Sequence, residues 1–387
     1  MQFIDLAAQQ ARIKEKIDQN IQNVLSHGKY IMGPEIQELE QRLAEFVGVK
    51  HCIGCSSGTD ALLMALMAKG VGPGDMIFTS PFTFIATAEI ISLLGATPVF
   101  VDIDPQTFNI DPVKLELAIQ TAKAVDQRSE DRDQRSAELN ARGIITVDLF
   151  GLPCDYHRIN AIAKKHDLFV IEDAAQALGG EYKGKKACAL AEIGCTSFFP
   201  AKPLGCYGDG GAVFTDSDEI VEKLVSIRMH GKGSHKYDNT LIGLNGRLDT
   251  LQAAILLAKL DIFPEEIDLR QKVAQRYTDL LSPPASSQAI LLPQTPRDAR
   301  SVWAQYSVLA KNAESRSEIQ SALKSAGIPT AIYYPKPLHL QTVFADLGYK
   351  EGDFEVSEDA SNRIFSLPMH PYLKEEEQQR ITKILND

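Results

Sequence analysis

The sequence predicts an α/β protein: a large domain built on a mostly parallel, seven-stranded sheet, followed by a smaller α+β domain. Short apolar runs alternate with helical patterns through the first two thirds of the 387 residues. Several runs are too apolar to leave one face in water, which is typical of a parallel sheet covered by helices on both sides. The pattern changes near residue 262. We therefore expect a large domain over residues 1–261, including an N-terminal helical segment, and a small domain over 262–387.

The apolar runs predict the strands of the large domain in chain order, at 51–55, 76–79, 98–101, 144–147, 168–172, 196–199 and 212–215. Apolar residues at helical spacing predict helices over 59–69, 84–94 and 159–166. Residues 127–142 are dense in charged and polar side chains, which predicts a solvated excursion between a helix and a strand.

The last third predicts helices over 248–260 and from Pro264 onward, because proline favours the first helical turn. Strand-like patterns cover 303–309 and 329–334. Between them, Ser315-x-x-Glu318 has the form of a capping box before a helix over 319–326. We read this part as the small α+β domain.

Composition excludes several classes of protein. The chain is 44% hydrophobic and 24% charged, which are ordinary globular values. Its net charge of −11 repels nucleic acid and anionic lipid, so neither is an expected partner. We find no apolar run long enough to span a membrane and no signal-peptide pattern at residues 1–6, so we expect a cytoplasmic protein. Cys52-x-x-Cys55 lacks a second pair, so we expect structural thiols and no metal site.

Asp173 is the first residue that can carry chemistry. It follows the strand expected at 168–172, and ligands of an open α/β sheet bind at the carboxyl ends of its strands. The alternative is an N-cap, since a helix-compatible run follows.

Lys202 is the second such residue. It lies just past the strand expected at 196–199, between Pro200 and Pro203. Desolvation lowers the pKa of a lysine and makes it a better nucleophile toward an aldehyde. The alternative is a loop lysine that reaches into solvent.

A third segment, residues 56–60, follows the first strand and opens a helix. Backbone N–H groups at such a junction bind phosphate. The alternative is simple N-capping by Ser57 or Thr59.

Together, a lysine, an aspartate and an anion-binding helix start are what pyridoxal 5'-phosphate requires. The lysine would form a Schiff base, the aspartate would keep the pyridine nitrogen protonated, and the helix start would hold the phosphate. An aromatic group should cover the ring, and Phe82 or Phe84, after the second strand, could supply it. No G-x-G-x-x-G follows the first strand, so a nicotinamide enzyme is not expected.

The chain resembles the sugar aminotransferases of the DegT/DnrJ/EryC1/StrS family. The motifs that carry the resemblance span nearly the whole chain: Gly33-Pro34-Glu35, Ser57-Gly58-Thr59-Asp60-Ala61-Leu62, Phe82-Thr83-Phe84, Glu172-Asp173-Ala174-Ala175-Gln176, Ser197-Phe198-Phe199-Pro200-Ala201-Lys202, Gly208-Asp209-Gly210-Gly211 and Asn245-Gly246-Arg247-Leu248-Asp249. The resemblance implies fold type I of the pyridoxal phosphate enzymes, which is aspartate aminotransferase-like. It also implies a homodimer whose active sites lie at the subunit interface.

The resemblance implies roles for individual residues. Lys202 would be the catalytic lysine, and Asp173 the partner of the pyridine nitrogen. The remaining cofactor-binding residues would be Ser57, Gly58, Thr59 and Ser197 at the phosphate, Phe84 over the ring with Phe82 behind it, Gln176 near the ring hydroxyl, and Asn245, which would reach the cofactor of the neighbouring subunit. The substrate-binding residues would be Arg247, Tyr333, Tyr334 and His339, although both tyrosines could equally pack in the small domain.

The implied reaction moves an amino group from L-glutamate to a UDP-linked 2-acetamido keto sugar, for bacterial surface polysaccharide such as O-antigen or lipopolysaccharide. Lys202 stands where dehydratases of the family have histidine, which favours amino transfer. The resemblance also implies that members acting on a uronic acid tend to carry an arginine pair, suited to binding a carboxylate, in the segment that is residues 230–239 here, and this chain has no arginine there. We therefore expect UDP-2-acetamido-4-keto-6-deoxyglucose as substrate, with C3 of UDP-2-acetamido-3-keto-glucuronic acid as the alternative. A more remote alternative is a regulator that binds the cofactor or an amino sugar without turnover.

Overall fold

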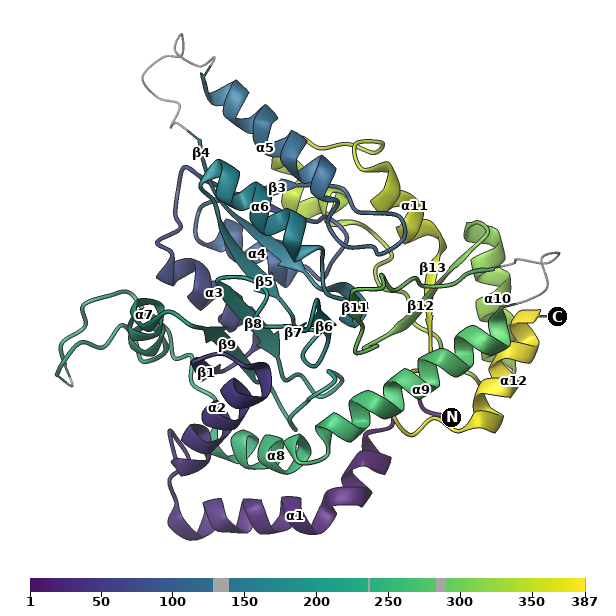
Figure 1. Cartoon of the computed structure of the whole chain (residues 1–387), viewed down its shortest axis with the longest axis horizontal. Coiled ribbons are helices and arrows are strands. Elements are labelled where there is room, and N and C mark those ends of the chain that lie inside the picture. The colour runs from purple at the N-terminus through teal and green to yellow at the C-terminus, as the bar shows by residue number, and fades with distance from the viewer. Residues whose placement is uncertain (128–138, 236, 283–289, 387) are drawn as a thin grey trace.

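The computed structural model describes residues 1–127, 139–235, 237–282 and 290–386, and it contains the expected seven-stranded sheet (Figure 1). The strands of this sheet are β1 (His51–Cys55), β2 (Asp75–Thr79), β3 (Thr97–Phe100), β4 (Asn140–Val147), β5 (Phe169–Asp173), β8 (Ile193–Ser197) and β9 (Gly211–Thr215). All seven strands expected from the sequence are therefore confirmed. β4 begins at Asn140 rather than at 144.

The strand order is β1-β9-β8-β5-β4-β2-β3. β9 pairs antiparallel with β1 and β8, whereas the pairs β8–β5, β5–β4, β4–β2 and β2–β3 are parallel. The carboxyl ends of all strands except β9, and the beginning of β9, therefore lie at one edge of the sheet. We call this the carboxyl edge, and it is where ligands bind in open α/β sheets.

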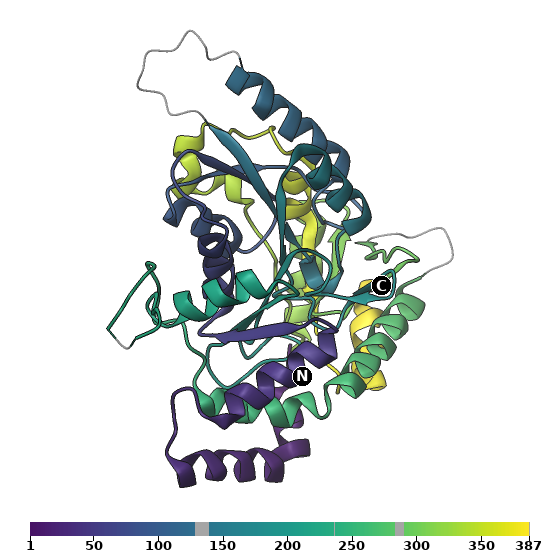
Figure 2. The same cartoon turned by 60° about the vertical axis from the view of Figure 1, so that its left-hand side comes forward.

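Helices cover both faces of the sheet (Figures 1 and 2). α2 (Pro34–Val47), α5 (Pro112–Gln127), α6 (Tyr156–His166) and α8 (Thr250–Leu260) share one core with the sheet residues Ile144 and Val170. α3 (Gly58–Ala68), α4 (Ala86–Leu93) and α7 (Asp218–Arg228) share the other core with Ile145 and Ile171. Since successive strand residues point to opposite faces, both must be apolar, which explains the continuous apolar runs.

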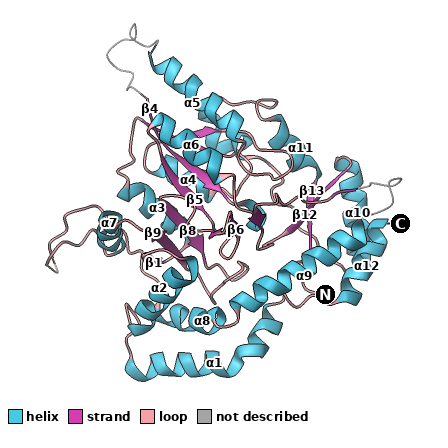
Figure 3. Cartoon of the chain, viewed as in Figure 1, coloured by secondary structure: helices cyan, strands magenta, loops and turns pink. Residues whose placement is uncertain are grey.

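The C-terminal part contains a second, antiparallel sheet of β10 (Ile290–Leu291), β12 (Tyr306–Ala310) and β13 (Ile364–Leu367), in that order, at the right of Figure 3. It packs against α10 (Ala313–Ser325), α12 (Glu375–Asn386) and the second half of α9 (Phe263–Leu281). The beginning of α9 instead packs through Phe263 and Ile267 into the core of the large sheet. The division at residue 262 stays a prediction.

Two expectations for this part are wrong. Residues 329–334 form no strand and make a single bridge, from Ala331 to Ser366 of β13. Pro329, the first residue of the segment, and Pro335, which follows it, cannot donate ladder hydrogen bonds. The third strand is β13, which follows α11 (Glu355–Arg363) directly. The capping box is also absent, because α10 starts earlier: Asn312 is its N-cap and accepts the Ser315 N–H, so Ser315 lies inside the helix.

The remaining described elements complete the scaffold. α1 (Leu6–His27) packs on α8 through Ile13 and Ile17, and β6 (Glu181–Tyr182), β7 (Lys185–Lys186) and β11 (Ala299–Arg300) form a small third sheet. Three 3-10 helices cover Leu149–Gly151, Leu338–Leu340 and Thr342–Leu347. Most of the excursion expected at 127–142 lies outside the described residues. Within the described part of the chain, no helix combines the length and apolar composition that a bilayer span requires.

Candidate active site

Lys202 lies in a tight turn that follows β8. Its backbone N–H donates to the Phe199 carbonyl (2.8 Å). Gly205 closes the turn, where a Cβ atom would lie 2.5 Å from the Pro200 carbonyl oxygen. The Lys202 amine is surrounded by protein, although part of the residue's surface is accessible. Desolvation therefore lowers the pKa of the amine, while the negative charge of Asp173 opposes that shift.

Asp173 ends β5 at the carboxyl edge, and only 6% of it is exposed. Its Oδ2 accepts from the Thr87 hydroxyl (2.8 Å), and its Oδ1 accepts from the Ala175 N–H (3.2 Å). Burial raises the pKa of Asp173, whereas these two hydrogen bonds and the charge of Lys202 lower it. Turns rather than a helix follow, so Asp173 is not an N-cap. The charges of Asp173 and Lys202 therefore act on each other at the carboxyl edge.

The start of α3 forms a cradle at the same edge. Ser57 is the N-cap and accepts the Asp60 N–H (3.0 Å), so the first N–H groups, of Gly58 and Thr59, have no intrahelical acceptor. A Cβ on Gly58 would lie 2.6 Å from the Ser197 Cβ, so α3 approaches the end of β8 as closely as only glycine permits. Exposed N–H groups and a serine at a helix start suit an anion.

Gln176 and aromatic rings form the next part of the site. The Gln176 Oε1 accepts from the Phe150 N–H (2.7 Å), and its Nε2 donates to the Tyr334 hydroxyl (3.2 Å). The Phe84 ring lies 6.5 Å from the Tyr334 ring and is 56% exposed, while Phe82 behind it is 1% exposed. Phe84 is thus the ring of this pair that is free to cover a ligand. Tyr334 brings the C-terminal part of the chain to the carboxyl edge.

A backbone hydrogen bond holds the segment that contains Asn245 and Arg247 next to the start of α3. The carbonyl between them, that of Gly246, accepts from the Ser56 N–H (3.2 Å), next to the start of α3. Asn245 is exposed. The Arg247 Nη1 lies 4.0 Å from the Met229 sulfur, and its buried Nε has no hydrogen-bond partner. No carboxylate pairs with Arg247 among the described residues.

The structure does not bring His339 together with the other candidate residues. Its side chain is fully buried; its Nε2 lies 2.9 Å from the Glu358 carboxylate, and its ring packs 4.6 Å from that of Phe354. Tyr333 is partly exposed and neighbours Tyr334 with ring centroids 6.0 Å apart.

A pair of buried carboxyl groups that the sequence did not predict, Asp148 and Glu172, lies behind the site. Glu172 accepts the N–H groups of Cys188 (2.6 Å) and Leu190 (2.9 Å). The Oδ1 of Asp148 accepts from the Cys154 N–H and the Tyr156 hydroxyl, each at 2.9 Å, and its buried Oδ2 is unpartnered. Burial raises the pKa of both carboxyls, that of Asp148 to about 6. Their positions at or next to strand ends were the available signal.

We expect Asp148→Asn to stabilise the protein by about 1–3 kcal/mol at pH 7.5 and to lose this advantage near pH 4.5. With its raised pKa, folded Asp148 keeps a proton that the unfolded chain releases between about pH 4 and 6, so the wild type loses stability as pH rises through that window. Asparagine keeps the acceptor for Cys154 and Tyr156. Urea unfolding at both pH values measures the difference, with the exposed Asp346→Asn as control. Equal destabilisation by D148N at both values would contradict the expectation.

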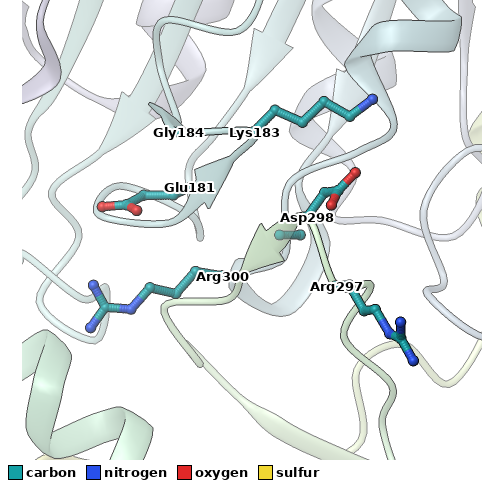
Figure 4. Close-up of a pocket in the computed structure, with 7 residues that line it drawn as sticks. Glu181, Lys183, Gly184, Arg297, Asp298 and Arg300 are labelled. Carbon is teal, nitrogen blue, oxygen red and sulfur yellow. The ribbon is translucent and has the colours of Figure 1, made fainter.

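A cavity of about 510 Å³ lies on the small third sheet, and it is not the candidate site. Its lining residues are Glu181, Lys183, Gly184, Arg297, Asp298, Ala299 and Arg300. Figure 4 shows that the charged side chains diverge from one another instead of converging on a common point. Neither Lys202 nor Asp173 lines it.

Comparison with known sequences gives one consistent result. The model of the DegT/DnrJ/EryC1/StrS aminotransferase family matches residues 11–386. UDP-2-acetamido-2-deoxy-3-oxo-D-glucuronate aminotransferase of Pseudomonas aeruginosa is 51% identical over 373 residues, which cover 96% of each chain. A protein of Geobacillus stearothermophilus named pleiotropic regulatory protein is 44% identical over 98% of this chain and 96% of its own.

Solved structures agree. A DegT/DnrJ/EryC1/StrS aminotransferase from Brucella abortus superposes with a TM-score of 0.91 at 47% identity, covering 100% of this chain and 98% of the other. NtdA from Bacillus subtilis, solved with its bound cofactor PMP, superposes with a TM-score of 0.86 at 30% identity, covering 99% of this chain and 82% of the other.

Proposed function

The chain belongs to the DegT/DnrJ/EryC1/StrS aminotransferase family, and we propose that it moves the amino group of L-glutamate to C3 of UDP-2-acetamido-2-deoxy-3-oxo-D-glucuronate. It is a pyridoxal phosphate-dependent aminotransferase of fold type I. The observation that carries the sugar is the 51% identity, over 96% of both chains, to the Pseudomonas enzyme with that substrate in its name. This favours the alternative over the expected 4-keto-6-deoxy sugar. The product would serve bacterial surface polysaccharide synthesis.

The residues at the carboxyl edge fit pyridoxal phosphate. The buried amine of Lys202 would hold the cofactor, and Asp173, anchored by Thr87 and Ala175, would face its ring nitrogen. The cradle formed by Ser57, Gly58, Thr59 and Ser197 would hold its phosphate. When bound, the cofactor supplies an electron sink for the negative charge that develops on the carbon being deprotonated.

Side chains of the protein would carry out the proton transfers. The lowered pKa of Lys202 gives a larger fraction of neutral amine at neutral pH, so its Nζ can take a proton from the α-carbon of glutamate and deliver one to C3 of the sugar. Two hydrogen bonds orient the buried Asp173 carboxyl and favour its charged form. The exposed ring of Phe84 would cover one face of the cofactor ring and keep water from it.

A uronate substrate brings a carboxylate that needs a cation. Arg247 supplies one: its guanidinium has a buried, unpartnered Nε and no carboxylate partner among the described residues. An arginine can bind a carboxylate through two parallel hydrogen bonds. The arginine that residues 230–239 lack is therefore available two residues after Asn245.

We expect Arg247→Met to lower kcat/KM for the 3-oxo uronate about 100-fold, because a charge-assisted bidentate contact is lost. The matched control substrate is UDP-2-acetamido-2-deoxy-3-oxo-glucose, which has the same keto group and no carboxylate, and for which we expect less than about a threefold change. The protein is preloaded with the amine form of the cofactor, and each sugar is scored by the return of the lysine-bound absorbance. Equal losses on both sugars would assign Arg247 to a shared part of the substrate, such as the diphosphate.

The same assay tests the sugar itself. Wild type is offered the 3-oxo uronate, the 3-oxo glucose derivative and UDP-2-acetamido-4-keto-6-deoxyglucose. A response to the 4-keto sugar alone would overturn the proposed substrate while leaving the aminotransferase in place.

Because the Geobacillus relative is named pleiotropic regulatory protein, a regulatory role is the second candidate function. Glutamate distinguishes the two, because an aminotransferase converts the lysine-bound cofactor to its amine form and a pure binder does not. The presence of Lys202, with its desolvated amine, and of the buried Asp173 supports turnover.

We also propose a homodimer with shared sites. Asn245 is exposed, and its neighbours Leu241 and Ile242 are 44% and 86% exposed. Apolar side chains of this size, clustered near a polar side chain, suit a protein–protein interface. Asn245 would complete the partner's site.

A further inference from the structure

Side chains of α8 are hydrogen-bonded to the chain segment that follows Lys202. Tyr207 exchanges two hydrogen bonds with the Gln252 side chain, its N–H donating to Oε1 (2.9 Å) and its carbonyl accepting from Nε2 (3.4 Å). Seven residues further along α8, which is about two helical turns, the Lys259 Nζ donates to the Gly205 carbonyl (2.6 Å) and lies 4.3 Å from the centroid of the Tyr207 ring. Gly205 is the residue that closes the turn. Both ends of the segment 205–207 are thus attached to the same helix.

Lys259 is an unusual group for this position. It is fully buried (0% exposed) and has no carboxylate within ion-pair distance among the described residues. Burial lowers the pKa of its amine to about 8, although the charge of Glu266 opposes the shift. A methionine or leucine would fill this volume without the free-energy cost of burying an amine, so we expect the amine to have a specific role. The contacts of Lys259 identify this role as the hydrogen bond to the Gly205 carbonyl.

We propose that Lys259 is a positioning residue, which sets the location of the Lys202 amine by holding the Gly205 carbonyl. The inference rests on the proposed role of Lys202 and adds a residue to it. Lys202 and Gly205 belong to one turn, in which Gly205 packs so closely on the Pro200 and Phe199 carbonyls that a Cβ would not fit. We therefore expect a displacement of Gly205 to be passed on to Lys202. Releasing Gly205 frees the turn to shift outward and admits water to the Lys202 amine.

The test compares Lys259→Met with wild type in the cofactor-free protein. Lysines are labelled with acetic anhydride over a range of pH, and the labelling of Lys202 is followed by peptide mass spectrometry. Because water reaches the amine, we expect the labelling midpoint of Lys202 to rise by about one pH unit in K259M, toward the value of an ordinary lysine. We expect its dissociation constant for pyridoxal phosphate to rise about tenfold. The exposed Lys223→Met serves as the lysine control and should change neither quantity.

A second variant keeps the test decisive if K259M does not fold. Gln252→Ala releases the same turn at Tyr207 and should shift the Lys202 midpoint in the same direction by a smaller amount. An unchanged midpoint in the folded variants, accompanied only by a lower Tm, would overturn the inference and make Lys259 purely structural. Absence of cofactor binding in the wild type would instead overturn the proposed function, and the labelling comparison would still decide the role of Lys259.

Discussion

Replacing Lys202 with alanine is expected to slow the conversion of the cofactor to its amine form by glutamate by about three to four orders of magnitude. Two contributions are lost together: the nucleophilic amine that would hold the cofactor, and the base that moves the proton at the α-carbon of the donor. The local structure should persist, because the turn is held by backbone contacts, such as that of Lys202 N–H with Phe199, and by α8. Single-turnover absorbance changes on adding glutamate give the rate.

The control for this variant is again Lys223→Met, which should retain the wild-type rate. A loss of less than about tenfold in K202A would contradict the assignment of Lys202 as the base. The variant also tests the shared site. If Lys202 of one subunit works with Asn245 of the other, mixing K202A with Asn245→Ala and exchanging subunits should restore about a quarter of wild-type activity, since half of the dimers are hybrids with one intact site of two. No restoration would place both residues in the same subunit's site.

Asp173→Asn is expected to lower kcat/KM for glutamate by about 10²–10³-fold. Asparagine has the same shape and can keep the hydrogen bond from the Thr87 hydroxyl on its one side-chain oxygen, while its NH2 group would face the Ala175 N–H, so the change removes the charge and one of the two hydrogen bonds. Without the charge, the ring nitrogen of the cofactor would no longer be held protonated. The loss of the carboxylate also removes the charge that opposes the desolvation of Lys202, so the pKa of Lys202 should fall further.

Two measurements check the Asp173 prediction. Steady-state kinetics give the loss of rate, and the pH dependence of Lys202 labelling in the cofactor-free protein gives the direction of its pKa. Thr87→Val, which removes the anchoring hydroxyl and keeps the charge, should cost only about tenfold. If D173N were no more impaired than T87V, the negative charge would have no special role at this position.

Much of the architecture follows from the sequence. The seven strands are continuous apolar runs because each strand is buried on two faces, which requires consecutive residues to be apolar. Asp173 and Lys202 were identifiable for a related reason: polar residues at the end of such a run, or in the turn that follows it, lie at the carboxyl edge. Failures arose where the local signal was ambiguous. The strand expected at 329–334 lies between prolines, and α10 begins at the earlier of two good caps.

The sequence by itself thus determined the sheet, the edge at which chemistry occurs and the residue types placed there. Only the tertiary structure decided which side chains meet. It joined Gln176 to Tyr334, which are 158 residues apart, and Lys259 to Gly205, which are 54 apart. It also buried His339 against Glu358 and set Asp148 beside Glu172. The physical reason is that spacing along the chain encodes periodicity and strand ends, whereas contacts between distant elements depend on how whole helices and sheets pack.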